Sequence, residues 1–123
     1  MQLTHKTTRH AVDAGSPAAG RYLAAGSTLV PIMGTVTRLG RSLSADVEID
    51  DASVSRRHAL IVRQDGETIL LNDSSLNGTW HNGTRVERAV LRDGDEISLG
   101  AAQLRYVEVV EQATDPLDLA VAA

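Results

Sequence analysis

Apolar and polar residues form short runs along this chain, and turn-forming residues separate them. No segment shows the 3.6-residue apolar period of an amphipathic helix. Turn signals recur roughly every 8–12 residues, which is typical of a β-sandwich. The predicted strands are 21–25, 28–33, 35–39, 47–49, 58–63, 68–72, 79–81, 84–86, 96–99 and 103–110. We therefore predict an all-β fold: an antiparallel β-sandwich of about 11 strands, with the binding loops at one end.

Two dipeptides in this pattern predict tight hairpins. Asp65-Gly66 separates two apolar runs, and Asn82-Gly83 separates two short polar ones. Both residues of such a pair tolerate the positive φ angles that a type I′ turn requires.

The pattern predicts one domain with a tail at each side. Residues 1–20 mix Thr, His, Ala, Gly and Pro without a period, so we expect a disordered N-terminal tail. Residues 21–110 form the expected sandwich domain. Residues 111–123 contain Pro116, which does not continue a strand, and we expect a flexible C-terminal tail.

Composition excludes several classes of function. The net charge of −4 gives no overall attraction to nucleic acid or to an anionic membrane. The chain has no Cys, which excludes disulfides and thiolate metal sites, and no apolar run approaches the roughly 20 residues that cross a bilayer. Its four histidines do not form a metal-binding set, and we expect no cofactor. These observations, with the absence of an N-terminal apolar stretch, predict a cytoplasmic protein.

Three short polar segments, called islands below, lie at loop positions between the predicted strands: residues 40–41, 55–58 and 77–79. They contain Arg41, then Ser55 and Arg56, then Asn77. Arginine presents a planar fork of donors that matches phosphate oxygens, and serine adds a hydroxyl donor. Asparagine can both donate to and accept from a peptide main chain. This inventory predicts a site for a phosphorylated peptide.

The stretch from residue 37 to residue 109 resembles the forkhead-associated (FHA) domain family, and particularly its small actinobacterial members. The residues that carry the resemblance are Gly40-Arg41, Asp46, Val54-Ser55-Arg56-Arg57-His58-Ala59, Asp73, Ser75, Asn77-Gly78-Thr79, Asn82-Gly83, Asp93-Gly94-Asp95 and Leu99-Gly100. The resemblance implies an 11-stranded sandwich that binds phosphothreonine peptides at its loop tips and is not an enzyme.

The resemblance also implies roles for single residues. Arg41 and Ser55 match the principal phosphate ligands, Arg56 matches a further phosphate donor, and Asn77 matches the residue that grips the peptide main chain. The positions that it implies as loop-structural are Gly40, His58, Gly78, Thr79, Asn82 and Gly83.

Peptide specificity is expected to come from side chains that flank this pocket, with Ser53 and Leu76 as candidates. Many members have Thr or Ser at the position of Leu76, whereas bacterial members also carry Leu. The missing polar contact leaves open an alternative function, a phospho-independent interaction scaffold with the same fold.

Other residues near the islands have simpler interpretations. Arg57 should point away from Arg56, because neighbours in an extended chain face opposite sides, and a surface ion pair is expected. Ser55 and His58 could suggest a hydrolase, but their spacing within one loop and the absence of a glycine-framed nucleophile turn argue against it. Trp80 is expected to pack beside its hairpin.

The expected partner is a phosphothreonine-containing protein, either a Ser/Thr kinase or a kinase substrate. A second hypothesis is that the chain binds its own phosphorylated N-terminal tail, which contains Thr4, Thr7 and Thr8. A short tether would raise the effective concentration of such a ligand to about the millimolar range.

Overall fold

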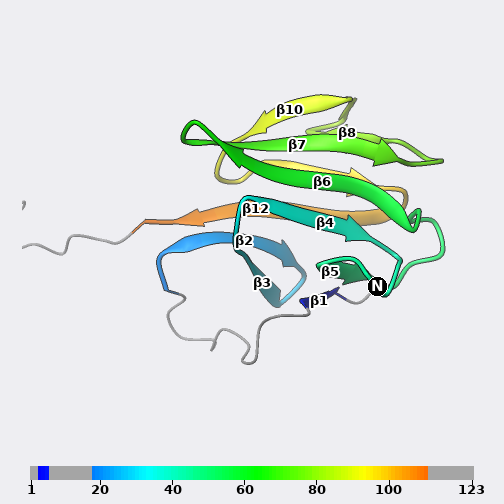
Figure 1. Cartoon of the computed structure of the whole chain (residues 1–123), viewed down its shortest axis with the longest axis horizontal. Coiled ribbons are helices and arrows are strands. Elements are labelled where there is room, and N and C mark those ends of the chain that lie inside the picture. The colour runs from blue at the N-terminus through cyan, green and yellow to red at the C-terminus, as the bar shows by residue number, and fades with distance from the viewer. Residues whose placement is uncertain (1–2, 6–17, 111–123) are drawn as a thin grey trace, which may run out of the picture.

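A computed structural model describes residues 3–5 and 18–110 and shows two β-sheets packed face to face (Figure 1). The first sheet has the order β1 (Leu3–His5), β5 (Val47–Ile49), β4 (Val36–Gly40), β6 (Arg57–Gln64), β7 (Glu67–Ser74), β10 (Arg88–Leu91). The second sheet has the order β3 (Thr28–Ile32), β2 (Gly20–Ala25), β12 (Ala102–Val109), β11 (Glu96–Leu99), β8 (Thr79–His81), β9 (Thr84–Arg85). The predicted all-β sandwich is confirmed. Among the strand pairs of the described residues only β4 and β5 run parallel.

The core lies between the sheets and is built almost entirely from aliphatic side chains. In β12, Leu104 and Tyr106 are buried while Arg105 between them is exposed, as the alternation in the sequence predicts. The core cluster consists of Leu23, Val30, Ile32, Leu39, Val47, Ile49, Val54, Ala59, Ile61, Leu70, Leu91, Ile97, Leu99, Ala102, Leu104 and Tyr106. Each strand from β2 to β7 contributes at least one side chain to it, so both sheets are anchored along their length.

Both predicted hairpin turns are present. Asp65 and Gly66 have φ angles of 52° and 79°, and Asn82 and Gly83 have φ angles of 49° and 86°. Two successive positive φ angles are the signature of a type I′ turn, whose twist matches that of the flanking strands. The first turn joins β6 to β7, and the second joins β8 to β9.

Two strands were not anticipated from the sequence. β10 has only four residues, Arg-Ala-Val-Leu, and its alternation is too short to recognise; it forms because it pairs with β7. β1 lies within the segment expected to be a disordered tail, and it pairs with the edge of β5. The rest of that segment up to residue 17, and all of residues 111–123, lie outside the described residues.

Within residues 3–5 and 18–110, no helix is long and apolar enough to cross a membrane. In the same part of the chain, no three His, Cys, Asp or Glu side chains are grouped in a way that could hold a metal ion.

Candidate phosphopeptide site

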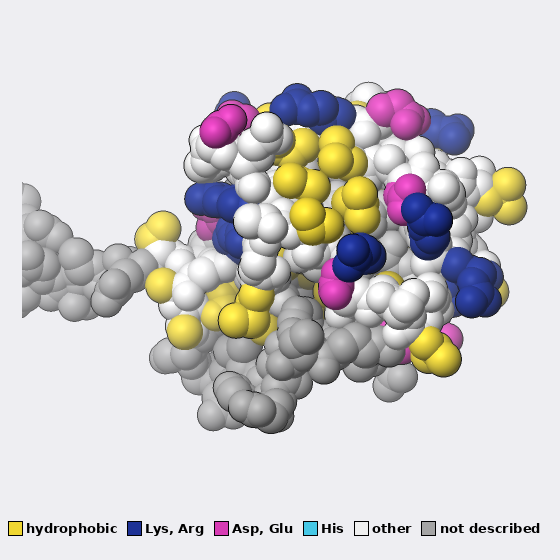
Figure 2. All heavy atoms as spheres, viewed as in Figure 1, with side chains coloured by type: hydrophobic (Ala, Val, Ile, Leu, Met, Phe, Trp, Pro, Cys, Tyr) yellow, Lys and Arg dark blue, Asp and Glu magenta, His cyan; other side chains and the backbone are white. Residues whose placement is uncertain are grey.

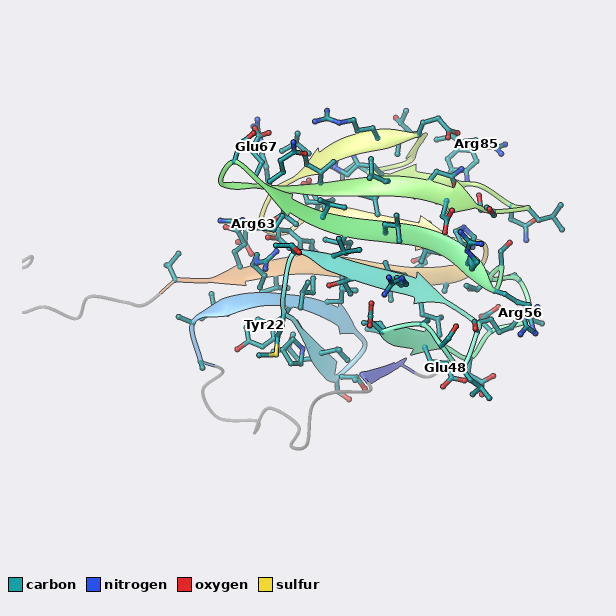
Figure 3. The ribbon with its side chains drawn as sticks, viewed as in Figure 1. Tyr22, Glu48, Arg56, Arg63, Glu67 and Arg85 are labelled. Carbon is teal, nitrogen blue, oxygen red and sulfur yellow. The ribbon has the colours of Figure 1, made fainter. Side chains whose placement is uncertain are left out.

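Three loops meet at one end of the sandwich: residues 41–46 after β4, residues 50–56 before β6, and residues 75–78 between β7 and β8. Arg56 marks this end in Figure 3, and Arg63 and Glu67 mark the opposite end. The strands β4 and β7 run toward this end and β6 starts from it (Figure 1), which is why loops that are distant in sequence converge there.

Backbone hydrogen bonds join the first two loops. Arg41 N donates to Ser55 O at 3.0 Å, and Ser42 N donates to Arg56 O at 3.2 Å. The approach is so close that a Cβ atom on Gly40 would lie 2.1 Å from Arg56 O. Any side chain at residue 40 would therefore push the two loops apart.

One guanidinium nitrogen of Arg41 is engaged, and within the described residues the other two have no hydrogen-bond partner. Its Nε donates to Val54 O at 3.0 Å, and Val54 itself is buried. This bond orients the guanidinium at the loop end. Within the described part of the chain, no acidic side chain pairs with Arg41 or with the exposed Arg56. Their remaining N–H groups are available to an anion.

Ser55 connects the second loop to the third. Its Oγ accepts a hydrogen bond from Leu76 N at 2.9 Å. The hydroxyl proton is not used by this bond, so Ser55 can still donate to a phosphate oxygen. The side chain is half-buried, which fixes its direction better than a fully exposed serine would allow.

His58 is buried beneath the second and third loops and joins them by hydrogen bonds. It is fully buried, its Nδ1 accepts from Ser55 N at 3.0 Å, and its Nε2 donates to Gly78 O at 2.8 Å. One accepting and one donating nitrogen describe the neutral ring, and burial lowers the pKa of His58 against the opposing effect of the Gly78 bond. Because both ring nitrogens are bonded to backbone, His58 is not placed to act as a base on the Ser55 hydroxyl.

Asn77 is an exposed residue of the third loop, and its side chain bonds to the second loop. Its Nδ2 donates to Ser53 O at 2.8 Å. Its Oδ1 has no hydrogen-bond partner among residues 3–5 and 18–110, so it can accept from the N–H of a bound peptide.

Ser53 has a bracing role in the structure. Its Oγ donates to Asp51 Oδ1 at 2.6 Å and accepts from Ala101 N at 2.7 Å. The bonds that Asp51 accepts from the Ser53 hydroxyl and, second, from Ser53 N lower the pKa of Asp51. The Ser53 hydroxyl is thus engaged within the protein. A contact between Ser53 and a bound peptide stays a prediction.

Leu76 is 85% exposed at the tip of the third loop, where a bound peptide could cover it. The loop itself is held by Asn72, a residue that the sequence analysis did not single out. Asn72 Oδ1 accepts from Ser75 Oγ at 2.5 Å and from Thr79 Oγ1 at 2.8 Å. The available signal was a carboxamide at the end of an apolar strand, where it can bond the turn that follows.

Two of the expected loop-structural residues lie elsewhere. Asn82 and Gly83 are at the far end of β8 from Gly78, where Asn82 Oδ1 accepts from Glu96 N at 2.8 Å. They shape the β8–β9 hairpin, so the structure does not bring them to the three loops.

Arg57 and Trp80 lie beside the site rather than in it. Arg57 Nε is 3.4 Å from Asp73 Oδ2 in an exposed ion pair, as the sequence predicts. Trp80 is 36% exposed and its Nε1 donates to Asn77 O at 3.2 Å, so its indole supports the third loop.

Comparison with known proteins places this architecture among known domains. An oxoglutarate dehydrogenase inhibitor from Corynebacterium diphtheriae is 42% identical over 72 residues, which are 58% of this chain and 50% of the relative. The glycogen accumulation regulator GarA from Mycolicibacterium smegmatis is 41% identical over 71 residues, which are 58% of this chain and 45% of that relative. The chain spans about half the length of these curated relatives.

A solved structure from a structural and functional analysis of phosphothreonine-dependent FHA domain interactions has a TM-score of 0.69 and 26% identity. The match covers 74% of this chain and 98% of that one. Residues 37–100, which are more than half of this chain, match the model of the FHA domain, and the chain therefore belongs to the FHA domain family.

Proposed function

We propose that this chain is a phosphothreonine-dependent binding module that recruits a phosphorylated protein. The observation that carries the proposal is the set of free donors at one loop end. Arg41 is oriented by a bond to Val54 O, Ser55 keeps its hydroxyl proton, and Arg56 has no acidic partner in the described residues. A phosphate dianion can accept charge-assisted bonds from all three. The resemblance to an FHA structure studied for phosphothreonine-dependent interactions supports the same function.

The site needs little rearrangement before it binds. The bonds of His58 to Ser55 and Gly78, and of Asn77 to Ser53, fix the three loops relative to one another. A site whose loops are already ordered loses less conformational entropy when the ligand binds, and this favours affinity. A binding module of this kind requires no cofactor and no catalysis.

The partner that we propose is a Ser/Thr kinase or one of its substrates. Two of the relatives are named as an inhibitor of oxoglutarate dehydrogenase and as a regulator of glycogen accumulation, so they are regulators of other proteins or processes. The cytoplasmic location predicted from the composition belongs to the same proposal.

The chain's own tail is a second candidate ligand. Thr4 lies in β1, opposite Glu48 of β5, and Thr7 and Thr8 lie outside the described residues. For a phosphorylated Thr4 to reach the loops, β1 would have to leave its backbone pairing with β5.

The direct test is a screen of an oriented phosphopeptide library on the purified chain, followed by calorimetry with the best sequence in three forms. The phosphothreonine form should bind, and the unphosphorylated form should not. The phosphoserine form, which lacks one methyl group, should bind more weakly by about 1–3 kcal/mol. Equal affinity for the phosphorylated and unphosphorylated forms would instead favour the phospho-independent scaffold, in which the exposed Leu76 would make an apolar contact.

A further inference from the structure

The outer face of the first sheet carries apolar side chains that no described element covers. Val36, Val62, Ile69 and Val90 lie opposite one another in the register and form one row across β4, β6, β7 and β10. Ile69 is only 3% exposed although it does not belong to the core cluster, so its neighbours on the outer face bury it. Figure 2 shows hydrophobic side chains gathered on this face, with basic and acidic side chains around them. Apolar patches with a polar rim are typical of binding surfaces.

A groove leads from the loop end onto this face. Its volume is about 540 Å³, and its lining includes the apolar side chains of Val36, Ala45 and Leu60. Ser42 and Arg56 line the same groove, and both belong to the loops of the candidate phosphopeptide site. The groove is therefore continuous with that site.

The charges beside the groove favour an acidic occupant. Arg38 is 3.5 Å from Asp46, and the Arg57–Asp73 pair lies on the same wall. These two acidic residues are thus already matched. The lining itself holds three arginines, Arg38, Arg56 and Arg57, and one acidic residue, Asp73. Arg56 is assigned to the phosphate, and Arg57 pairs with Asp73. Arg38 is therefore the cation left for an acidic residue of the partner, and its solvent-exposed pair with Asp46 is a weak competitor.

We propose that this groove binds the stretch of the phosphorylated partner adjoining its phosphothreonine, through a branched apolar side chain and a neighbouring acidic residue. The apolar side chain would lie over Leu60, and the acidic residue would face Arg38. Leu60 of β6 lies four residues after Arg56, which directly precedes the strand, a distance of about 13 Å that four or five extended peptide residues can span. The inference rests on the proposed function and adds a second contact, which would select among phosphothreonine proteins.

The experiment uses the full chain and synthetic phosphothreonine peptides. A short peptide ends three residues from the phosphothreonine on each side. Two longer peptides add an extension that contains either Leu and Asp at the fourth to sixth positions or only Gly and Ser. Each extension is made separately on the amino and carboxyl sides. On one side, the Leu-Asp peptide should bind about tenfold more tightly than its Gly-Ser counterpart, because a leucine leaves water.

Variants locate the added contact. Leu60→Ser and Arg38→Ala should each reduce the preference for Leu-Asp while leaving affinity for the short peptide within about twofold, because neither residue belongs to the phosphate site. Val110→Ser is the matched control: it changes an exposed apolar residue just beyond β12, outside the groove, and should keep the whole preference. Arg38→Ala keeps the test valid if Leu60→Ser does not fold.

The outcomes separate the two proposals. Equal affinity of the Leu-Asp and Gly-Ser peptides on both sides, or a preference that survives both groove variants, would overturn the groove proposal and leave phosphothreonine binding intact. If no peptide binds better phosphorylated than unphosphorylated, the proposed function itself fails.

Discussion

The two ends of the sandwich treat their polar side chains in opposite ways. At the loop end, Arg41 uses only its Nε in a hydrogen bond, to Val54 O, and Arg56 has no acidic partner in the described residues. At the opposite end, polar groups bond one another. Tyr106 Oη lies 3.0 Å from Thr68 Oγ1 and donates to Glu108 Oε2 at 2.6 Å.

Further hydrogen bonds link the polar groups at this opposite end. Arg63 Nη1 donates to Thr68 Oγ1 at 2.8 Å, and Glu108 N donates to Asp93 Oδ1 at 2.8 Å. Burial, followed by the Glu108 bond, raises the pKa of Tyr106 to about 12. One end therefore uses its hydrogen bonds for stability, and the other keeps donors for a ligand. The following substitutions test that division.

The largest effect is expected from Arg41→Ala. Removing one partner of a charge-assisted contact should cost about 2–5 kcal/mol of phosphopeptide binding free energy, with the melting temperature unchanged. Calorimetry measures this loss. Arg41→Lys should recover only part of it, because an ammonium group lacks the bidentate fork. Arg88→Ala, at another exposed arginine, is the control, and an undiminished affinity in Arg41→Ala would remove Arg41 from the site.

His58→Ala should act mainly on stability. It deletes a buried ring with bonds to Ser55 N and Gly78 O, and it should lower the free energy of unfolding by about 2–4 kcal/mol. Denaturant unfolding measures this change. Affinity should fall only as far as the loops lose order. A variant that kept its stability but lost all binding would show that His58 contacts the ligand instead.

Ser55→Ala should weaken phosphopeptide binding by about 1–3 kcal/mol, because it removes one hydrogen bond to a charged group. The effect should be smaller than that of Arg41→Ala. Comparing the two by calorimetry with the same peptide ranks the donors. If the serine variant lost more affinity than the arginine variant, the order of the two phosphate ligands would be reversed.

Stability of the unliganded chain should fall in mild acid. Burial lowers the pKa of His58 when folded, whereas an unfolded histidine titrates near about 6.5. Below that pH the unfolded state binds a proton that the folded state does not. The free energy of unfolding should then fall by up to about 1.4 kcal/mol per pH unit, until the pH reaches the folded pKa. Above about pH 6.5 this contribution is constant.

Urea unfolding at a series of pH values measures that slope, and His58→Ala should flatten it. The slope surviving in the variant would assign it to another histidine. Asp51, whose pKa is lowered, contributes only at more acidic pH, because its stabilising ionised form persists until the pH falls into the carboxylate range.

The smallest effect is expected at the opposite end. Tyr106→Phe removes a hydroxyl that bonds Glu108 and lies beside Thr68, and it should lower the free energy of unfolding by about 1 kcal/mol. Phosphopeptide affinity should be unchanged. A clear loss of affinity would show that the two ends are energetically coupled, against the division described above.

Local pattern was sufficient for most of the fold and much of the site. Strands β5, β8 and β11 have the predicted bounds, because their alternation and their flanking turns are properties of adjacent residues. The same holds for the two type I′ turns and for a surface ion pair at Arg57, whose partner, Asp73, only the structure identifies. The candidate phosphate-binding residues could be recognised because the donor groups of arginine and serine are properties of the residue types themselves.

The sequence by itself determined most of the strands and the identity of the phosphate-binding donors, whereas the tertiary structure decided which of these donors remain free to bind a ligand. Ser55 bonds a residue 21 positions away, and Asn77 bonds one 24 positions away. Strand β10, the bracing of Ser53 and the groove over Leu60 likewise depend on partners from other strands or loops. No local period encodes such contacts, because they arise only when the sheets pack and bring separate loops to the same end.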